Sequence, residues 1–333
     1  MRMRDNECWS TLVLLIVLLT ALGACDPGGY AIDPRGVAAP VPILGSARDF
    51  RVDEDNPAAV WVRSVPTGPE ADVIRDRIAS RPAAQVVRTA EQVKLAVRRA
   101  GATNTMSIFT IAPDQPEACG MGHRAWLDGI AAGIAGAPAL VVIRAAKGCT
   151  VTESRQQLFL SAAETLGALA RTIVLLDVSD AISASAAAEM IASAGRAVDG
   201  FAVNVRGYAN EAAATATANG VRDRLLAATG RNDYLMVADS SRNGAPTNGG
   251  CNPSGAQVGQ NQVLRPERDK LQLLWLTTPG VSDGPCGEAP TSHAGEFVPS
   301  LAYMLVARSP ETSYLTNPPS LSSPSLTPSS TRR

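Results

Sequence analysis

The segment Leu274–Gly287, LWLTTPGVSDGPCG, begins as a buried strand and breaks into a turn-rich loop. The loop carries one acid, Asp283, and one cysteine, Cys286. Loops that follow the carboxyl ends of strands hold the chemistry of α/β barrels. Asp283 is therefore a candidate catalytic carboxylate, provided that the rest of the chain builds a barrel and supplies a partner acid.

Upstream of this loop, short apolar segments alternate with helical segments. Strands are predicted at residues 105–112, 139–145, 171–179, 198–205, 233–241 and 271–278, and helices at 90–101, 123–136, 152–169, 183–195 and 211–230. This alternation is typical of a parallel sheet with helices outside it. So many units in one domain favour a barrel over an open sheet. In both α/β folds, functional residues lie at the carboxyl ends of the strands.

The N-terminus has the features of a bacterial export signal. Arg2 and Arg4 precede an apolar run over residues 12–22, shorter than the about 20 residues that span a membrane. The run ends in Leu22-Gly23-Ala24-Cys25, which resembles a lipobox, so we expect cleavage before Cys25 and a lipid on its sulfur. An ordinary signal peptide or an uncleaved anchor is the alternative. In each case the body of the protein is expected outside the cytoplasm. A lipid on Cys25 would anchor it to the bacterial membrane or cell surface.

Four regions are predicted along the chain. Residues 1–24 are a lipoprotein signal peptide, and residues 25–48, rich in Gly, Pro and Ala, are a tether. Residues 49–308 form the folded barrel. The Ser/Pro/Thr-rich tail, residues 309–333, cannot bury enough apolar surface to offset its ordering entropy and is expected to be disordered.

Composition limits the classes of partner. The formal net charge is −1, so nucleic acid and acidic membrane surfaces are not expected partners. Only 4% of the residues are aromatic, which is low for a sugar-binding cleft. The sequence has two histidines and no CxxC pair, so neither a metal nor a cofactor is expected. We expect a monomer.

The cysteines indicate a disulfide framework. Cys8 lies in the signal and Cys25 in the lipobox, which leaves Cys119, Cys149, Cys251 and Cys286. An even set in an oxidising compartment favours two disulfides, for which counting alone allows three pairings. Because each pair follows two neighbouring strands, Cys119–Cys149 and Cys251–Cys286 would staple the loops of one rim, and we predict this pairing.

Polar side chains stand where the predicted strands end. They are Asp177, Asn204, Arg206, Tyr208, Asp239, Arg242, Asn243, Thr277 and Asp283. For any single one of them, a role in capping a loop is the common alternative. As a set, they line one rim and suit a neutral, hydroxyl-rich ligand such as a glycan.

These residues lie in motifs that resemble glycoside hydrolase family 6, the inverting endoglucanases and cellobiohydrolases. VDGFAVNVRGY is similar to the family's G-F-A-x-N-V-S-N-Y, ADSSRNGAPTNGGCNPSG to I-D-T-S-R-N-G with W-C-N-P-P-G, and LLWLTTPGVSDGPCG to L-W-V-K-P-P-G-E-S-D-G. FRVDEDNPAAVWVRSVPTGPEADVIRDRIASRP resembles the family's N-terminal segment, and AGEFVPSLAYMLV its closing helix. The resemblance implies a distorted, partly open parallel (β/α) barrel, TIM-like in type. It also implies the disulfide pairing given above and an ancestral hydrolysis of β-1,4-glucan.

The resemblance also implies that the catalytic acid is missing. Inverting hydrolysis needs an acid and a second carboxylate about 6.5–9.5 Å apart. The family's E-P-D sequence, which ends in the acid, matches Arg144, Ala145 and Ala146. A second family Asp, which tunes the acid, matches Ala118. Asp283 matches the candidate base, and Asp177 stands in a supporting position.

Groups that grip the sugar are also replaced. Gly250, Val86-Val87 and Thr110 match family aromatic residues, and Thr277 and Val281 match a Lys and a Glu. The remaining candidates for substrate binding are Asn204, Arg242, Asn243, Trp275 and Thr277. Arg242 has a structural alternative, a buried pair with Asp239 or Asp283.

Two functions follow from this pattern. The first is a cellulase-like surface lipoprotein that is inactive or very weak in polysaccharide catabolism. It would bind a β-glucan, an envelope glycan or a protein partner through the old cleft. The second is an active divergent β-1,4-glucanase with Asp283 as base and Asp114, Glu117 or Asp180 as a replacement acid.

Overall fold

A computed structural model describes residues 50–113, 118, 122–144, 155–248, 250–265 and 270–309. They all belong to the unit that spans residues 42–333. The predicted signal peptide, the lipid site Cys25 and the tail beyond residue 309 lie outside the described residues. The boundaries of the four predicted regions stay predictions.

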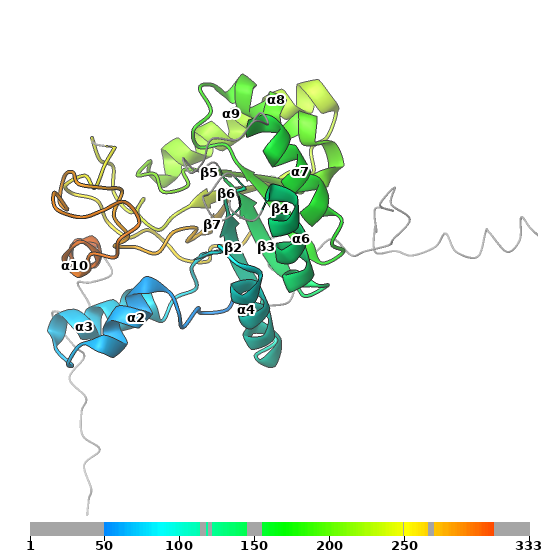
Figure 1. Cartoon of the computed structure of the whole chain (residues 1–333). Helices are drawn as coiled ribbons and strands as arrows, with labels where there is room; N and C mark the ends of the chain where they lie inside the picture. Colours follow the sequence, from blue (N-terminus) through cyan, green and yellow to red (C-terminus); the bar gives the residue numbers. More distant parts are fainter. Residues whose placement is uncertain are drawn as a thin grey trace, which may run out of the picture. The chain divides into compact units, whose positions relative to one another are not determined.

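The described part of the chain builds one sheet of seven parallel strands, in which the spatial order is the chain order (Figure 1). The strands are β1 (Gln85–Val86), β2 (Ser107–Ile111), β3 (Ala139–Ile143), β4 (Thr172–Asp177), β5 (Gly200–Val203), β6 (Leu235–Asp239) and β7 (Gln272–Leu274). In the centre, Val141 on β3 pairs with Phe109 on β2 and with Val174 on β4. The predicted alternation of strands and helices is confirmed.

The sheet curls so that its two edges approach each other. The backbone N–H of Ala84, next to β1, donates to the carbonyl of Trp275, next to β7, at 2.8 Å. The hydroxyl of Thr110 donates to the carbonyl of Leu276 at 3.5 Å. No strand ladder joins β1 to β7 among the described residues. The sheet is therefore a curled half-barrel, which confirms the predicted partly open barrel.

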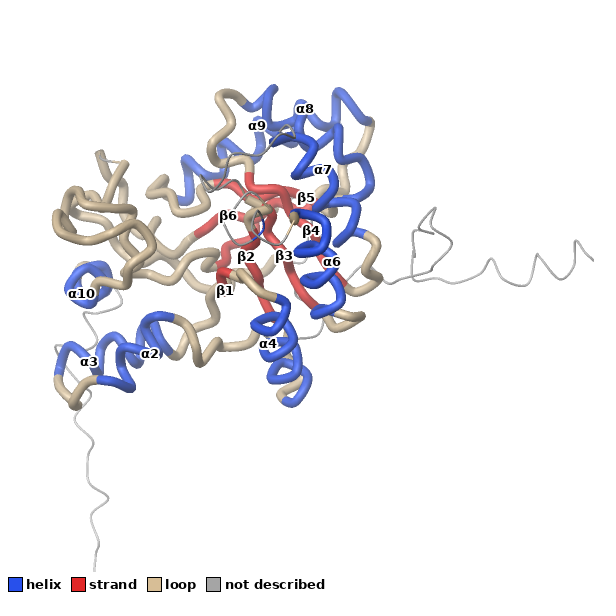
Figure 2. Tube along the Cα trace, in the orientation of Figure 1, coloured by secondary structure: helices blue, strands red, loops and turns tan. Residues whose placement is uncertain are grey.

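Both faces of the sheet are apolar and buried. On β3, Leu140 and Val142 belong to an inner cluster, and Val141 and Ile143 to an outer cluster. The same alternation runs through the other central strands, which Figure 2 draws in red. Burial on both faces explains why the strands are continuous apolar runs rather than alternating ones.

In the part of the chain that the structure describes, the outer face is covered by α4 (Ala90–Ala102), α6 (His123–Ile134), α7 (Arg155–Gly167), α8 (Ala184–Ala194) and α9 (Glu211–Thr229), with the short η2 (Gly195–Ala197) after α8. Each packs against the next in chain order. Side-chain caps fix where several begin. Thr89 and Gln92 form a capping box on α4, and Ser183 and Asn210 cap α8 and α9.

A third apolar cluster lies beside the sheet. It joins α2 (Pro57–Ser64), α3 (Pro69–Ile74), the π-helix η1 (Arg75–Ala79) and α10 (Pro299–Ala307) to Trp275 and Tyr208. The sequence had indicated α10 as a closing helix, but not α2, α3 or the two-residue β1. The strand predicted at 271–278 is shorter than expected, because only Gln272–Leu274 pairs as β7.

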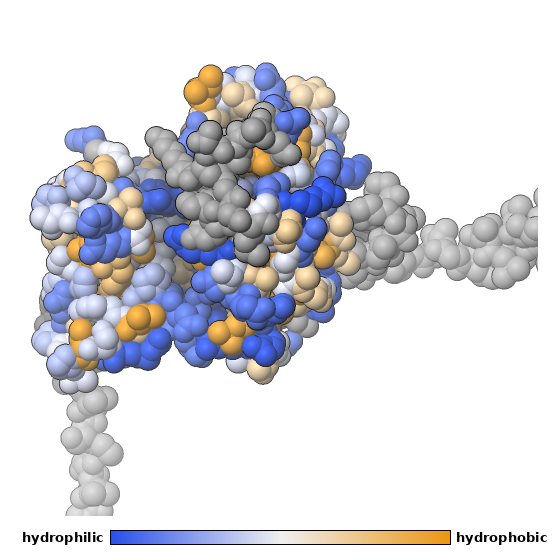
Figure 3. Space-filling model, viewed as in Figure 1, coloured by the Kyte–Doolittle hydropathy of each residue, from blue (hydrophilic) through white to orange (hydrophobic). Residues whose placement is uncertain are grey.

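The surface is mostly hydrophilic on the face drawn in Figure 3, with scattered hydrophobic patches. Large hydrophobic side chains that are exposed include Ile182, at 96%, in the loop after β4. Within the described residues, no helix combines the length and the apolar character needed to cross a membrane.

Candidate active site

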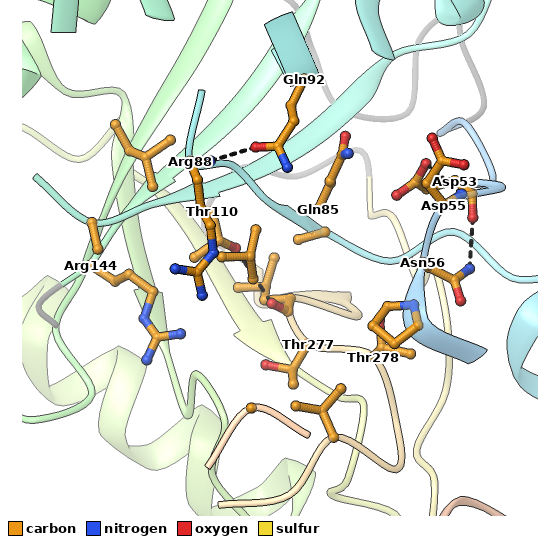
Figure 4. A pocket seen from close by; sticks show the side chains of 18 of the residues that line it. Asp53, Asp55, Asn56, Gln85, Arg88, Gln92, Thr110, Arg144, Thr277 and Thr278 are labelled. Carbon is orange, nitrogen blue, oxygen red and sulfur yellow. Dashed lines mark hydrogen bonds between the residues drawn. The ribbon is translucent and has the colours of Figure 1, made fainter. Parts of the chain in front are cut away.

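A cavity of about 860 Å³ lies at the carboxyl ends of the strands, where a parallel barrel is expected to hold its ligand. Segments that follow β1, β2, β3, β4, β5 and β7 contribute to its wall. Its polar lining residues are Asp53, Asp55, Asn56, Gln85, Arg88, Gln92, Arg99, Thr110, Arg144, Asp180, Arg206, Thr277 and Thr278 (Figure 4).

The described cavity wall contains no aromatic side chain. Val86 and Thr110, which match family aromatic residues, both line it. Aliphatic groups of Ile111 and Leu276 complete the apolar part of the wall. A sugar ring would therefore meet small apolar surfaces and hydroxyl groups in place of a stacking platform.

Asp283 is held by cationic and hydroxyl donors from two other loops. Nη1 of Arg242 lies 3.0 and 3.1 Å from its two carboxylate oxygens, and Nη2 of Arg206 donates to Oδ1 at 3.2 Å. The hydroxyl of Tyr208 donates to Oδ2 at 2.7 Å, and the backbone N–H of Asn252 donates at 3.4 Å. We refer to Asp283, Arg206, Tyr208 and Arg242 as the Asp283 clamp.

Arg242 and Asp283 are the most buried charges of the clamp, and two cations act on one carboxylate. The side chain of Arg242 is 0% exposed and that of Asp283 14%. The Arg242 guanidinium stacks over the Tyr208 ring at 4.2 Å and donates to its hydroxyl at 2.7 Å. Burial raises the pKa of Asp283, but the charge of Arg242, the hydrogen bonds from Tyr208 and Arg242 and the charge of Arg206 outweigh it. The pKa of Asp283 therefore lies below its ordinary value.

This environment suits a structural carboxylate better than a general base. A base works best with a pKa near the operating pH, and its lone pairs must face the water that it activates. Both oxygens of Asp283 already accept hydrogen bonds from protein donors, and Asp283 is not among the residues that line the cavity. Its role as catalytic base stays a prediction.

The loop that carries Asp283 is braced by Asn252 and by a disulfide. Nδ2 of Asn252 donates to Oγ of Ser282 at 3.0 Å and to the carbonyl of Gly284 at 2.8 Å. Oδ1 of Asn252 accepts the backbone N–H of Asp283 at 3.0 Å. Cys251 and Cys286 form a disulfide, as the sequence predicted. Cys119 and Cys149 lie outside the described residues, so the other predicted disulfide stays a prediction.

Arg144 stands where the family's E-P-D sequence begins, and its side chain points into the cavity (Figure 4). Its backbone N–H donates to the carbonyl of Ile111 at 2.9 Å, which continues the β2–β3 ladder. Burial lowers the pKa of its guanidinium, and the charges of Asp177 and Asp180 only partly oppose this. Ala145 and Ala146 lie outside the described residues.

The other acid positions divide into described and undescribed ones. Ala118, in register with the family's tuning Asp, is fully buried in the outer apolar cluster. Asp180 is exposed and lines the cavity. Asp114 and Glu117 lie outside the described residues. Of the three candidate replacement acids, Asp180 is the one within the described residues, and it faces the cavity.

Asp177 ends β4, and its carboxylate accepts the backbone N–H of Ser179 at 2.9 Å. Burial raises the pKa of Asp177 to about 6, against the hydrogen bonds from Ser179 and the charge of Arg144. A carboxyl group with such a pKa is partly protonated near neutral pH, as a proton donor must be. The sequence had given Asp177 only a supporting role.

Replacing Asp177 by asparagine is expected to stabilise the fold at pH 7.5 by about 1–3 kcal/mol. The folded pKa, about 6, lies above the ordinary value of 3.8, so this carboxyl group favours folding below pH 3.8 and loses that contribution as pH rises through 6. Urea unfolding should therefore show a gain at pH 7.5 that shrinks toward pH 4. Asp223→Asn, in an exposed pair with Arg222, serves as the control. Equal loss of stability by Asp177→Asn at both pH values would contradict the prediction.

The predicted substrate-binding residues separate into two groups. Thr277 lines the cavity. The other four make loop or core contacts: Asn204 donates to the carbonyls of Ala209 and Asp239, Arg242 belongs to the clamp, Asn243 is 5% exposed, and Trp275 packs in the third apolar cluster. Substrate binding by these four stays a prediction.

Sequence reasoning paired Arg242 with Asp239 or Asp283, and the structure pairs it with Asp283. Asp239 instead accepts backbone N–H groups of Arg206, Ser241 and Leu276. The part played by Arg206 and Tyr208 in holding Asp283 was missed, although both had been placed at the same rim. Among the described residues, no cluster of three or more His, Cys, Asp or Glu side chains is placed to hold a metal ion.

Comparison with known proteins agrees with this geometry. The family described as "Glycosyl hydrolases family 6" matches residues 47–309. Endoglucanase 1 of Streptomyces halstedii is 31% identical over 330 residues, covering 89% of this chain and 97% of its own length. Endoglucanase A of Thermobispora bispora is 29% identical over 331 residues, covering 89% of this chain and 70% of its own length.

Solved structures share the fold. The endoglucanase Cel6 from Mycobacterium tuberculosis, in complex with methyl-cellobiosyl-4-deoxy-4-thio-β-D-cellobioside, superimposes with a TM-score of 0.67 at 24% identity, over 80% of this chain and 98% of its own. A family 6 enzyme from Orpinomyces sp. Y102 gives a TM-score of 0.64 at 17% identity, over 79% and 97% of the two chains. From the family match and the endoglucanase relatives, together with the half-barrel fold, we conclude that this chain belongs to glycosyl hydrolase family 6.

Proposed function

We propose that the chain is a glycan-binding member of glycosyl hydrolase family 6 that hydrolyses β-1,4-glucan very slowly or not at all. The observation that carries the proposal is the Asp283 clamp. Its donors hold both oxygens of the one carboxylate that the family resemblance assigns as the candidate base. The export signal and a lipid on Cys25 would place this binding function at the bacterial surface, and both stay predictions from the sequence.

The acid half of the reaction supports the same proposal. Protonation of the leaving oxygen by a general acid contributes about 10²–10⁴-fold to such reactions. In the resemblance, Ala146 occupies the position of that acid, and alanine has no proton to give. Arg144, two residues earlier, is a permanent cation and would disfavour the positive charge that develops on the sugar in an oxocarbenium-like transition state.

The cleft itself is retained. A cavity of about 860 Å³ lies within the range of small-molecule sites, about 300–1,000 Å³, and can hold part of an oligosaccharide. Its hydroxyl and amide groups, among them Thr110, Thr277 and Gln85, are suited to sugar hydroxyls. The relatives are named endoglucanases, which supports β-1,4-glucan as the class of ligand.

An active divergent glucanase is the second candidate. The observation that favours it is the pKa of Asp177, which burial raises to about 6 beside the cavity residues Arg144 and Asp180. Asp177 or Asp180 would then protonate the leaving oxygen. Asp283 would still have to lose part of its clamp before it could orient a water molecule.

Hydrolysis assays separate the two candidates. We expect the full-length chain to show no turnover of chromogenic cellobiosides or of soluble β-glucan above the blank, while calorimetry detects binding of cellotetraose. Turnover that is lost in Asp283→Asn, Asp177→Asn or Asp180→Asn would overturn the proposal. Because Asp283→Asn leaves Arg242 buried without its counterion, each variant is first shown to keep a cooperative unfolding transition at the assay temperature.

A further inference from the structure

Arginine side chains gather at one end of the cavity. Arg88, from the segment after β1, and Arg144, after β3, both direct their guanidinium groups into it next to Thr110 (Figure 4). Arg206, after β5, lines the same cavity, and its charge acts on Arg144. None of these positions is a binding arginine in the motifs that carry the family resemblance.

At this end, the described charged residues of the lining are Arg88, Arg144, Arg206 and Asp180. At the other end, Arg99 donates to Asp55 at 2.7 Å and Asp53 accepts from Arg51 at 3.3 Å. Arg206 shares the single carboxylate of Asp283 with Arg242, so two cations face one anion. Asp180 lines the cavity at this end, and the charges of Asp177, Asp180 and Asp239 act on Arg144.

The Arg144 guanidinium is partly removed from water, and one of its nitrogens lacks a hydrogen-bond partner. Its Nε is buried and has no partner among the described residues. Removing a guanidinium from water is costly unless an anion accepts its hydrogen bonds. The lowered pKa of Arg144 has this same origin, since burial is its largest cause. An anionic group in the cavity would supply the missing acceptor.

Unpaired acceptors lie on the same wall. Oε1 of Gln85 and Oδ2 of Asp53 are buried, line the cavity and have no hydrogen-bond donor among the described residues. Such atoms suit the hydroxyl groups of a sugar, which donate hydrogen bonds. The cavity therefore combines guanidinium groups at one end with hydroxyl-accepting oxygens farther along, and it offers no aromatic platform among its described residues.

From this arrangement we propose that the cavity binds an acidic saccharide, a β-linked glycan that contains uronate residues, with a carboxylate held against Arg144 and Arg88. The inference rests on the proposed glycan-binding function and narrows its ligand class. A planar carboxylate matches the guanidinium fork, and such charge-assisted hydrogen bonds are stronger than those to a neutral hydroxyl. The ionic contact takes the place of aromatic stacking as the main source of affinity.

Calorimetry with two matched oligosaccharides tests the proposal. Cellotetraose and a β-1,4-linked glucuronate tetramer differ only at C6, where the second carries a carboxylate. The full-length chain, in mild detergent at pH 7.5 and low salt, is expected to bind the glucuronate tetramer about tenfold or more tightly. The preference should shrink as sodium chloride screens the partly exposed arginines.

Variants locate the preference in the cavity. Arg144→Gln is expected to reduce it to less than about threefold, and Arg88→Gln to weaken it in the same direction. Arg224→Gln, on the outer helix α9 and bonded to Ser185 and Gly220, is the matched control and should leave it unchanged. Unfolding curves of each variant establish that the fold is kept, so that lost binding reports on the cavity.

Each other outcome has a defined meaning. Equal affinity for the two tetramers, or a preference that survives Arg144→Gln, overturns the acidic-saccharide proposal and leaves glycan binding in place. Inorganic phosphate that displaces the glucuronate tetramer at equal concentration also overturns it, because the site would then recognise charge alone. If neither tetramer binds, the proposed glycan-binding function fails as well.

Discussion

Replacing Arg242 by methionine is expected to lower the free energy of unfolding by about 3–5 kcal/mol, because Asp283 loses its fully buried cation and keeps only the partly exposed Arg206. Arg242 is fully buried, and its guanidinium donates to Asp283, to the Tyr208 hydroxyl and to the backbone carbonyl of Arg206. Methionine fills a similar volume, so the loss reflects electrostatics and hydrogen bonding more than a cavity. Urea unfolding at pH 7 measures the difference.

Arg206→Met is the matched control, because it removes the other cation of the same clamp. The Arg206 side chain is 27% exposed, and Asp283 keeps Arg242 when it is removed, so we expect a loss of less than about 1 kcal/mol. Similar losses in the two variants would contradict the larger role given to the buried Arg242. A loss below about 1 kcal/mol for Arg242→Met would show that the clamp does not hold the loop.

The effect of Arg242→Met should also depend on pH. The folded pKa of Asp283 is lowered, so the stability that it contributes is present above the ordinary value of 3.8 and is lost as pH falls through the folded value. The difference between the protein and Arg242→Met should therefore narrow in acid.

The fold could be predicted from the sequence because its strands are buried on both faces. Runs such as Ala139–Ile143 and Thr172–Asp177 are continuous and apolar, and each is followed by a helical segment. The smaller elements had no such signal. β1 has two residues, and α2 and α3 are short helices that begin at prolines, so neither periodicity nor length marked them.

The sequence predicted which rim the candidate site residues lie on, but it predicted their side-chain contacts less well. Asp283 and Arg242 were placed on one rim, and their pairing was one of two alternatives. The backbone of Arg206 has a φ of 59°, and this conformation directs its side chain to Asp283. Non-glycine residues seldom adopt a positive φ, so the sequence offered no reason to expect it at an arginine. The side-chain contacts join loops after β5, β6 and β7, so no local pattern contains them.

Trp275 shows that a motif match does not determine which side of the strand a side chain faces. It follows β7 between Leu274 and Leu276, both of which belong to the inner cluster. Alternation along an extended chain then turns Trp275 to the opposite side, where it packs with α3 and α10 and its Nε1 donates to the carbonyl of Gly259 at 3.3 Å. The tryptophan of the motif that carries Asp283 is therefore a core residue in this chain.

Removing the Cys251–Cys286 disulfide is expected to lower the free energy of unfolding by about 2–4 kcal/mol. The two cysteines are 35 residues apart in the chain, and closing a loop of that length restricts the unfolded ensemble by up to about 4 kcal/mol. The folded loop keeps other restraints, because Asn252 still binds Ser282, Gly284 and Asp283 through its side chain. The double variant Cys251→Ser/Cys286→Ser should therefore unfold at lower urea concentration while its cavity keeps the same affinity for oligosaccharide.

Reductant provides the control for this prediction. Dithiothreitol should lower the stability of the protein by at least the same amount as the double substitution, and it should have a smaller effect on the double variant. Any effect that remains there reports the predicted Cys119–Cys149 pair, which the variant Cys119→Ser/Cys149→Ser would remove. If reductant destabilises the double variant as much as the unaltered chain, the Cys251–Cys286 bond does not stabilise the loop that carries Asp283. Loss of oligosaccharide binding in the oxidised double variant would show instead that the disulfide shapes the folded cavity, against the loop-entropy account.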